Sequence, residues 1–292
     1  MAFVKEHLIY SEGLPKERYR HGVPLIGKAN GQLKLLFGKL FFLNHMYVPS
    51  IHRNPVIVYV GSGHSIGTSV IHELFPEFRF ILYDTIRPTV DSFRESGRVT
   101  WHNEYFDPKN PPRIEGDIFF ICDVRKLSHD GKKMSPLEMD QGISEDMELQ
   151  AEILRVLKPV ASLLKFRAPH DNEDVIKHRG GTTFEYFSGI PFIQPWAGVQ
   201  SIEMRLIVAS DEPSTYDFRN ICDVLFYHNT RVRSQEFIVD RATSQHLASK
   251  AKDHDDSKYD IAGSIFIISE YLLKVGLDPT PENIHKIISM IP

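Results

Sequence analysis

Short apolar runs that alternate with amphipathic helical patterns constrain the fold of this chain more than any other feature. Residues 56–61 read VIVYVG, a continuous apolar run typical of a strand buried on both faces. Helical periodicity follows at 65–75, and the next strand-like run is RFILYD at 79–84. The alternation continues through strand-like runs at 98–102, 117–123 and 159–167 and a strong helix at 142–157. It predicts an α/β protein with a doubly wound, mostly parallel sheet.

Further elements flank this alternation. A helix is expected at 31–46, and residues 190–194 and 201–209 are expected to form an antiparallel edge pair. Beyond Asp211, helices are predicted at 215–229, 259–275 and 281–290, with a polar stretch at 230–258. We therefore expect a single domain over residues 1–292. It divides into an irregular N-terminal arm (1–29), a catalytic core (30–210) and a helical C-terminal elaboration (211–292).

Composition excludes several classes of protein. The chain is 42% hydrophobic and 25% charged, as in ordinary soluble globular proteins. Its net charge of −4 argues against a protein that is basic throughout, but it allows a local basic groove for a phosphate backbone. Two cysteines, Cys122 and Cys222, do not suggest a disulfide framework, so a reducing, intracellular setting is the default expectation. No apolar run suggests a signal peptide or a membrane partner, and no His/Cys spacing suggests a metal site.

A glycine-containing turn follows the first predicted strand. Gly61, Gly63 and Gly67 have the spacing GxGxxxG, which differs from the commonest dinucleotide fingerprint. Such a turn lets a cofactor approach backbone N–H groups at the start of a helix, although it is also compatible with a tight turn that binds nothing. Asp84 ends the second strand, where a carboxylate can accept hydrogen bonds from both ribose hydroxyls of an adenosine-bearing cofactor. These signals fit NAD and S-adenosylmethionine equally well.

Four ionisable residues lie in or beside apolar segments, where an unpaired charge is costly. They are Lys34 in the predicted first helix, Asp123 and Lys165 at the ends of successive strands, and Glu203 in SIEMRLIV. Parallel strands end at one edge of a sheet, so Lys165 is the natural partner of Asp123. A purely structural ion pair is the alternative for Asp123, and a solvated strand face is the alternative for Glu203.

Several motifs that contain these residues resemble one family. GQLKLLFGKLFFL, VYVGSG, ICDVRK, PVASLLKFR and SIEMRL look like, and occur in the same order as in, the poxvirus-type cap-specific mRNA nucleoside-2′-O-methyltransferases. Those enzymes also serve as the processivity-conferring regulatory subunit of the viral poly(A) polymerase. The resemblance implies a Rossmann-like fold and S-adenosylmethionine as cofactor. It implies the catalytic set Lys34, Asp123, Lys165 and Glu203, and cofactor contacts from Gly61, Ser62, Gly63, Asp84, Arg87 and Asp123.

The chain departs from the family pattern at the glycine turn and in the cap pocket, where a family tyrosine falls near Gln200 and a guanine-reading acid near Cys222 or Asp223. The glycine turn has His64 and Ser65 where the family has Pro and Gly, and His170 stands where the family stacks an aromatic ring on the methylated guanine of the cap. Imidazole stacks less well than a larger aromatic ring on a cationic base. The residues that the resemblance suggests for RNA or cap binding are Tyr19, Arg125, Arg167, His170 and Asn172.

The function that the resemblance implies is methyl transfer to the ribose 2′-OH of the first transcribed nucleotide of capped mRNA. Lys165 is expected at that hydroxyl, either as a base or as a cation, roles that need opposite protonation states. The expected partners are capped RNA and a viral poly(A) polymerase catalytic subunit, and the expected location is the host cytoplasm or the virion. Methylation of uncapped RNA, a non-catalytic RNA-binding regulatory role and, from the glycines alone, an NAD-dependent oxidoreductase are the alternatives. Candidate phosphate contacts are Lys39, Arg125, Lys126, Arg167, Lys177, Arg179, Arg231 and Arg233.

Overall fold

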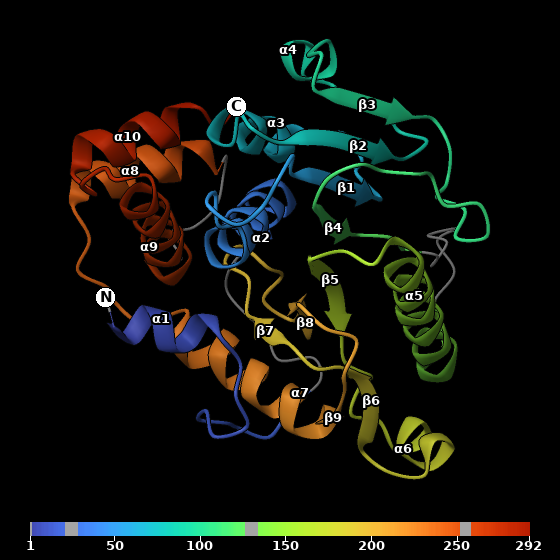
Figure 1. Ribbon diagram of the computed structural model, residues 1–292. Coiled ribbons are helices and arrows are strands. Elements are labelled where there is room, and N and C mark those ends of the chain that lie inside the picture. The colour runs from blue at the N-terminus through green and yellow to red at the C-terminus, as the bar shows by residue number, and fades with distance from the viewer. Residues whose placement is uncertain (1, 21–28, 126–133, 252–257) are drawn as a thin grey trace.

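The structure, a computed structural model, describes residues 2–20, 29–125, 134–251 and 258–292. Its centre is a seven-stranded sheet with the order β3-β2-β1-β4-β5-β8-β7 (Figure 1). Strands β1 to β5 are mutually parallel, whereas β8 runs antiparallel to both of its neighbours, β5 and β7. The strands are β1 (Val56–Val60), β2 (Arg79–Tyr83), β3 (Val99–His102), β4 (Ile118–Cys122), β5 (Ala161–Arg167), β7 (Ile190–Phe192) and β8 (Glu203–Val208). The predicted α/β fold with a mostly parallel sheet is confirmed.

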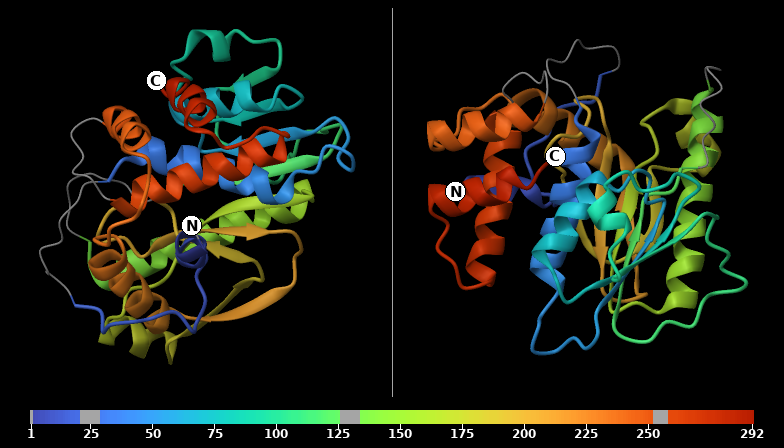
Figure 2. Two further views of the ribbon diagram at one scale, coloured as in Figure 1. Left: turned by 90° about the vertical axis from the view of Figure 1, so that its left-hand side faces the viewer. Right: turned by 90° about the horizontal axis from the view of Figure 1, so that it is seen from above.

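Helices cover both faces of the sheet, as the view from above shows (Figure 2, right). One face packs against α1 (Ala2–Leu8), α2 (Gly31–Met46), α3 (Ile66–Leu74), α8 (Arg241–Lys250), α9 (Lys258–Lys274) and α10 (Pro281–Ser289). The other packs against α5 (Pro136–Leu157), α6 (Glu173–Arg179) and α7 (Phe218–Tyr227). A short helix, α4 (Asp91–Arg94), precedes β3. Alternate residues of β1 enter the two cores, with Ile57 and Tyr59 on one side and Val58 and Val60 on the other.

The N-terminal segment was expected to be irregular, but its first part is a helix. Residues 2–8 form α1, because Val4 and Leu8 lie one helical turn apart and both are buried in the core that contains α9. The backbone then pairs briefly with the main sheet through a bridge between Ile9 and Phe192. The arm is therefore anchored to the core at its start.

The C-terminal region also differs from the prediction. The helix expected at 215–229 begins as a strand, β9 (Pro213–Asp217), which pairs with β6 (Thr183–Phe187) in a separate two-stranded sheet. The Asp217 side chain caps α7, which explains why the helix starts only at Phe218. The polar stretch 230–258 overlaps the π-helix His228–Val232 and contains α8, which is capped by Asp240. Helix α5 starts at Pro136, earlier than expected, because Ser135 and Glu138 form a capping box.

The main sheet brings together strand ends from distant parts of the sequence. The carboxyl ends of β1, β2, β4 and β5 lie at one edge, where ligands bind in open α/β sheets. Strand β8 is antiparallel, so its first residue reaches the same edge: Glu203 pairs with Arg167 at the end of β5. The commonest dinucleotide-binding order, 3-2-1-4-5-6, has no such antiparallel insertion.

Candidate active site

The glycine turn after β1 is fixed by a close backbone approach. Gly61 has φ +79°, and a Cβ at this position would lie 2.8 Å from the carbonyl carbon of Asp123. Only glycine satisfies both conditions without displacing the end of β4. Gly63 also has a positive φ, of +52°, but a Cβ there would meet nothing within 4 Å. Open space therefore lies beside the second glycine of the turn.

Asp84 connects this turn to the end of β2. One carboxylate oxygen accepts a 2.8 Å hydrogen bond from the Gly63 N–H, and the other accepts one of 2.8 Å from Ile86 N–H. The Ser62 hydroxyl is buried and has no hydrogen-bond partner among the residues that the structure describes. Arg87 is exposed three residues beyond Asp84. The expected cofactor-binding residues, with Asp123 after β4, thus lie at the ends of three neighbouring strands, β2, β1 and β4.

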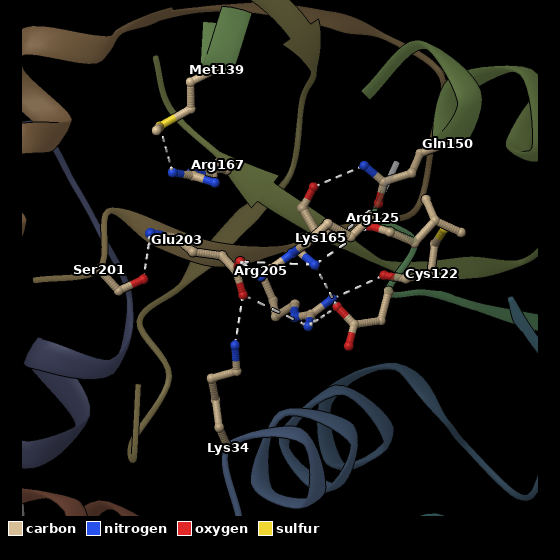
Figure 3. Close-up of polar contacts among 12 residues, drawn as sticks. Lys34, Cys122, Arg125, Met139, Gln150, Lys165, Arg167, Ser201, Glu203 and Arg205 are labelled. Atoms are coloured by element: carbon tan, nitrogen blue, oxygen red, sulfur yellow. Dashed lines mark hydrogen bonds and ion pairs between the residues drawn. The ribbon is translucent and has the colours of Figure 1, made fainter. Parts of the chain in front are cut away.

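The four ionisable residues converge, although they come from four different elements (Figure 3). Lys34 Nζ lies 2.7 Å from Glu203 Oε1, and Lys165 Nζ lies 3.0 Å from Asp123 Oδ1. The two pairs meet because Lys165 Nζ is also 3.9 Å from Glu203 Oε2. The expected partnership of Asp123 with Lys165 is present, and Glu203 is buried rather than on a solvated strand face.

A fifth ionisable residue, Arg205, completes the cluster and was not predicted. Its guanidinium donates 2.7 Å to Asp123 Oδ1 and 2.9 Å to the Cys122 carbonyl, and it lies 3.9 Å from Glu203. Its side chain is only 2% exposed. The sequence did hold a signal for it: Arg205 lies two residues after Glu203, so in a strand both side chains point to the same face.

The charges of the cluster shift one another. Burial acts to raise the pKa of Asp123, but Arg205 and Lys165 outweigh it and hold that pKa well below its usual range. Burial likewise opposes ionisation of Glu203, yet Lys34, Arg205 and Lys165 lower its pKa to about 2. Burial would lower the pKa of Arg205, but Asp123 and Glu203 raise it above the usual value. Both carboxylates and the guanidinium are therefore charged at neutral pH.

The backbone of Lys165 is held by Gln150 of α5. Its N–H donates 2.7 Å to the Gln150 side-chain oxygen, and its carbonyl accepts 3.0 Å from the side-chain nitrogen (Figure 3). Gln150 is almost fully buried. At the neighbouring strand, the Glu203 N–H donates 3.1 Å to the Ser201 hydroxyl. These contacts fix the backbone positions from which the Lys165 and Glu203 side chains extend.

The residues expected at RNA or cap fall into two groups. Arg125, 42% exposed, lies 3.5 Å from Glu203, and Arg167 pairs with Glu203 in the sheet, so both border the cluster. Arg167 also contacts His170 at 3.1 Å. Tyr19 packs edge-on against Phe226 on α7. Asn172 has a structural role, because its side-chain oxygen accepts the N–H groups of Asp174 and Val175 and so caps α6.

Several residues expected to contact phosphate are buried or already paired. Lys39 is 3% exposed and lies over the ring of Tyr59 at 5.1 Å, so it faces the core. Arg233 is buried against Asp260, and Arg179 is paired with Asp140 at 2.8 Å. Lys126 lies outside the described residues. Within the described part of the chain, no cluster of metal-ligating side chains occurs and no helix is long and apolar enough to cross a membrane.

Comparison with known proteins places the chain in a family. The family model for the poly(A) polymerase regulatory subunit matches residues 4–288. The chain belongs to this family. This poly(A) polymerase regulatory subunit family member is 24% identical to the cap-specific mRNA (nucleoside-2′-O-)-methyltransferase of fowlpox virus over 94% of this chain and 87% of that protein.

Myxoma virus (strain Lausanne) has a similar protein of the same name. It is 30% identical over 61% of this family member, which spans about half (52%) of the myxoma protein. The bluetongue virus RNA-capping protein VP4 is a structural neighbour with a TM-score of 0.46 and 16% identity, over 90% of this chain and 44% of that one.

Proposed function

We propose that this chain is an S-adenosylmethionine-dependent methyltransferase that methylates the ribose 2′-OH of the first transcribed nucleotide of capped mRNA. The observation that carries the proposal is the convergence of Lys34, Asp123, Lys165 and Glu203 beside the glycine turn. The names of the fowlpox and myxoma relatives support the same activity. A cluster with two lysines has no evident use in hydride transfer, so an NAD-dependent oxidoreductase is disfavoured.

The residues of the turn fit S-adenosylmethionine. Asp84 stands where a carboxylate can accept hydrogen bonds from the ribose hydroxyls, and Gly63 leaves room for a ligand against the backbone. The buried Ser62 hydroxyl, without a partner among the described residues, offers one more hydrogen bond. We assign Gly61, Ser62, Gly63, Asp84, Arg87 and Asp123 to the cofactor site. The cofactor supplies a methyl group that is already activated on a positively charged sulfur.

Lys165 is the residue that we place at the substrate hydroxyl. Asp123 and Glu203 hold its amine, and the Val124 carbonyl lies 3.5 Å from it. This arrangement suits an ammonium that stabilises negative charge as the hydroxyl loses its proton. Lys34 neutralises Glu203 from the other side and so completes the frame. Alignment of the hydroxyl by such a frame contributes up to roughly 7–11 kcal/mol in ideal cases.

RNA recognition is assigned to the border of the cluster. Arg125 and Arg167 are the proposed phosphate contacts, and His170 with Tyr19 is the proposed pair beside the cap guanine. Asn172 is not proposed as a direct contact, because it caps α6.

A methyl-transfer assay with labelled S-adenosylmethionine tests the proposal. Short capped RNA should accept the label at the 2′-oxygen of its first nucleotide, and the same RNA without a cap should accept far less. Lys165→Ala should lower the rate by about 10²–10⁴-fold. Lys165→Arg should retain part of the rate if the residue acts as a cation, and none if it acts as a base. Full activity of Lys165→Ala would contradict the proposal.

A second activity is suggested by the family to which the chain belongs. Its name supports a role as the regulatory subunit of a poly(A) polymerase. We propose this role alongside methyl transfer, with a viral polymerase catalytic subunit as partner and the host cytoplasm or virion as location. Co-purification with such a subunit and longer tails in a processivity assay are the expected results. Lys165→Ala should leave both unchanged.

A further inference from the structure

A hollow lies away from the ionisable cluster, between α5 and the two-stranded sheet. It is a groove of about 810 Å³. One wall is a face of α5 that includes Ser144, Glu148 and Arg155, and the other is strand β6 with all five of its residues. The Tyr186 hydroxyl crosses to α5 and donates 3.2 Å to the Met147 carbonyl. None of the four ionisable residues is among the described lining residues.

The edge of β6 that faces away from β9 is open. Phe218 N–H bonds to the Thr182 carbonyl, and Ser188 N–H bonds to the Glu212 carbonyl. In an antiparallel register hydrogen-bonded pairs alternate, so Phe184 and Tyr186 bond to β9. The backbone groups of Thr183 and Glu185 must then point outward. In the part of the chain that the structure describes, they meet no hydrogen-bond partner.

This open edge borders the groove. Strand β9 pairs with one edge of β6, and α5 forms the opposite wall of the groove. The outward groups of residues 183 and 185 repeat at about 7 Å, twice the rise of one strand residue. An unpaired strand edge with this spacing is a template for an extended chain. The groups of a helix or of a nucleobase would not match this spacing.

The charge of the lining restricts what such a chain carries. The groove continues toward α6 along a second hollow lined by Glu138, Asp140 and Arg179. Together, the described lining residues include five carboxylates and two guanidinium groups, and Arg179 is already paired with Asp140. The carboxylates are Glu138, Asp140, Glu148, Glu185 and Asp211. This surplus repels a phosphate backbone and attracts Lys or Arg side chains.

We propose that β6 accepts an extended, basic segment of a partner protein as a third strand of the small sheet. The added strand bonds to the outward backbone groups of Thr183 and Glu185. Its basic side chains face Glu185 on the strand and Glu148 across the groove. Strand β6 has five residues, so the docked segment is about five residues long. This site is independent of methyl transfer.

A pair of matched peptides tests the backbone part of the proposal. The probe is a fluorescently labelled peptide, Thr-Lys-Val-Lys-Thr-Lys-Val, and its control carries N-methyl groups on alternate residues. The control keeps every charge but cannot donate to β6. Anisotropy should show that the control binds at least about tenfold more weakly, as two or more hydrogen bonds are lost. Amide exchange should slow at residues 183–187 when the unmodified peptide is added.

Variants of the full chain test the same edge from the other side. Glu185→Pro removes an outward N–H without removing a bond to β9, whereas Glu185→Ala keeps that N–H and removes only the charge. Proline should weaken peptide binding further than alanine does, and both variants should retain methyl transfer. Glu148→Lys should weaken binding through charge alone.

Three results would overturn the proposal. One is equal binding of the N-methylated and unmodified peptides, since binding would then need no strand addition. A second is displacement of the peptide by short single-stranded RNA together with weaker RNA binding in Glu185→Pro, which would make the groove an RNA site. The third is a dimer of the chain that Glu185→Pro dissociates, which would make the occupant a second copy.

Discussion

Arg205 and Lys165 donate to the same oxygen of Asp123, at 2.7 and 3.0 Å. The arginine is bonded in addition to the backbone of Cys122, whereas the lysine amine also lies 3.9 Å from Glu203. One carboxylate oxygen therefore links a fixed cation to the cation that we place at the substrate. This division of labour leads to the first prediction.

Arg205→Lys should lower kcat by about 10- to 100-fold, because a single amine cannot hold both Asp123 and the Cys122 carbonyl, and Asp123 then positions Lys165 less well. KM for S-adenosylmethionine should change much less. Arg205→Met should reduce the free energy of unfolding by about 3–5 kcal/mol, since it removes one of the two cations bonded to the Asp123 carboxylate. Arg94→Lys, at the exposed Asp91 pair, is the control. Equal losses in kcat and cofactor affinity would argue against a positioning role.

Asp84→Asn should weaken S-adenosylmethionine binding by about tenfold, because the amide offers one oxygen in place of a charged carboxylate. Asparagine can still accept one of the two backbone N–H groups, so the turn should survive better than in Asp84→Ala. Calorimetric titration measures the affinity, and thermal unfolding checks the turn. Asp91→Asn, at the start of α4, should leave both unchanged. Unaltered affinity in a folded Asp84→Asn protein would remove the ribose assignment.

Glu203→Gln should alter the dependence of stability on pH. The pKa of Glu203 is lowered from 4.5 to about 2 in the folded chain, so its contribution is full above about pH 4.5 and disappears as the pH falls toward 2. At pH 7 this contribution is about 3 kcal/mol. The variant should be less stable by about that amount at neutral pH, and the difference should shrink in acid. Urea unfolding at several pH values measures it.

Lys39→Met should stabilise the protein. Burial lowers the pKa of Lys39 from 10.5 to about 7. The nearby Asp123 opposes this shift, and Arg205 adds to it. Between these values the unfolded chain holds more protons, so this residue's cost is full below about pH 7 and disappears as the pH rises to 10.5. Methionine has a similar shape and no charge, so the gain at neutral pH should reach up to about 5 kcal/mol.

The control for this prediction is Lys39→Arg, which keeps a permanent charge in the same buried place and should destabilise the chain at every pH. A Lys39→Met protein whose advantage does not fall between pH 7 and 10.5 would show that titration of the amine is not the cause. The measurement is the same series of unfolding curves.

The fold was largely predictable because continuous apolar runs allow few alternatives. VIVYVG and DIFFICDVR identify central strands, and the parallel order follows from the helices between them. The expected antiparallel edge pair is present as β7 and β8, with β8 on the inner side, next to β5. Strand β6 was not predicted; it pairs with β9 in a separate two-stranded sheet, and its partner lies far along the chain.

The site was predictable in its members and not in its connections. Sequence position placed Asp123 and Lys165 at neighbouring strand ends, so their contact was expected. It could not show that Glu203 would be buried, because that depends on the antiparallel direction of β8, which brings its first residue to the same edge. The same direction makes Arg205 part of the cluster. Asn172 appeared to be a ligand contact until the start of α6 revealed its role as a cap.

The contact between Gly61 and the backbone of Asp123 has a mechanical consequence. The turn that we assign to the cofactor and the strand end that carries Asp123 approach each other without a side chain between them. Neither segment can shift without displacing the other, so the proposed cofactor site and the ionisable cluster are coupled through this backbone contact. A change that widens this contact would misalign the two substrates even if every charged residue remained in place.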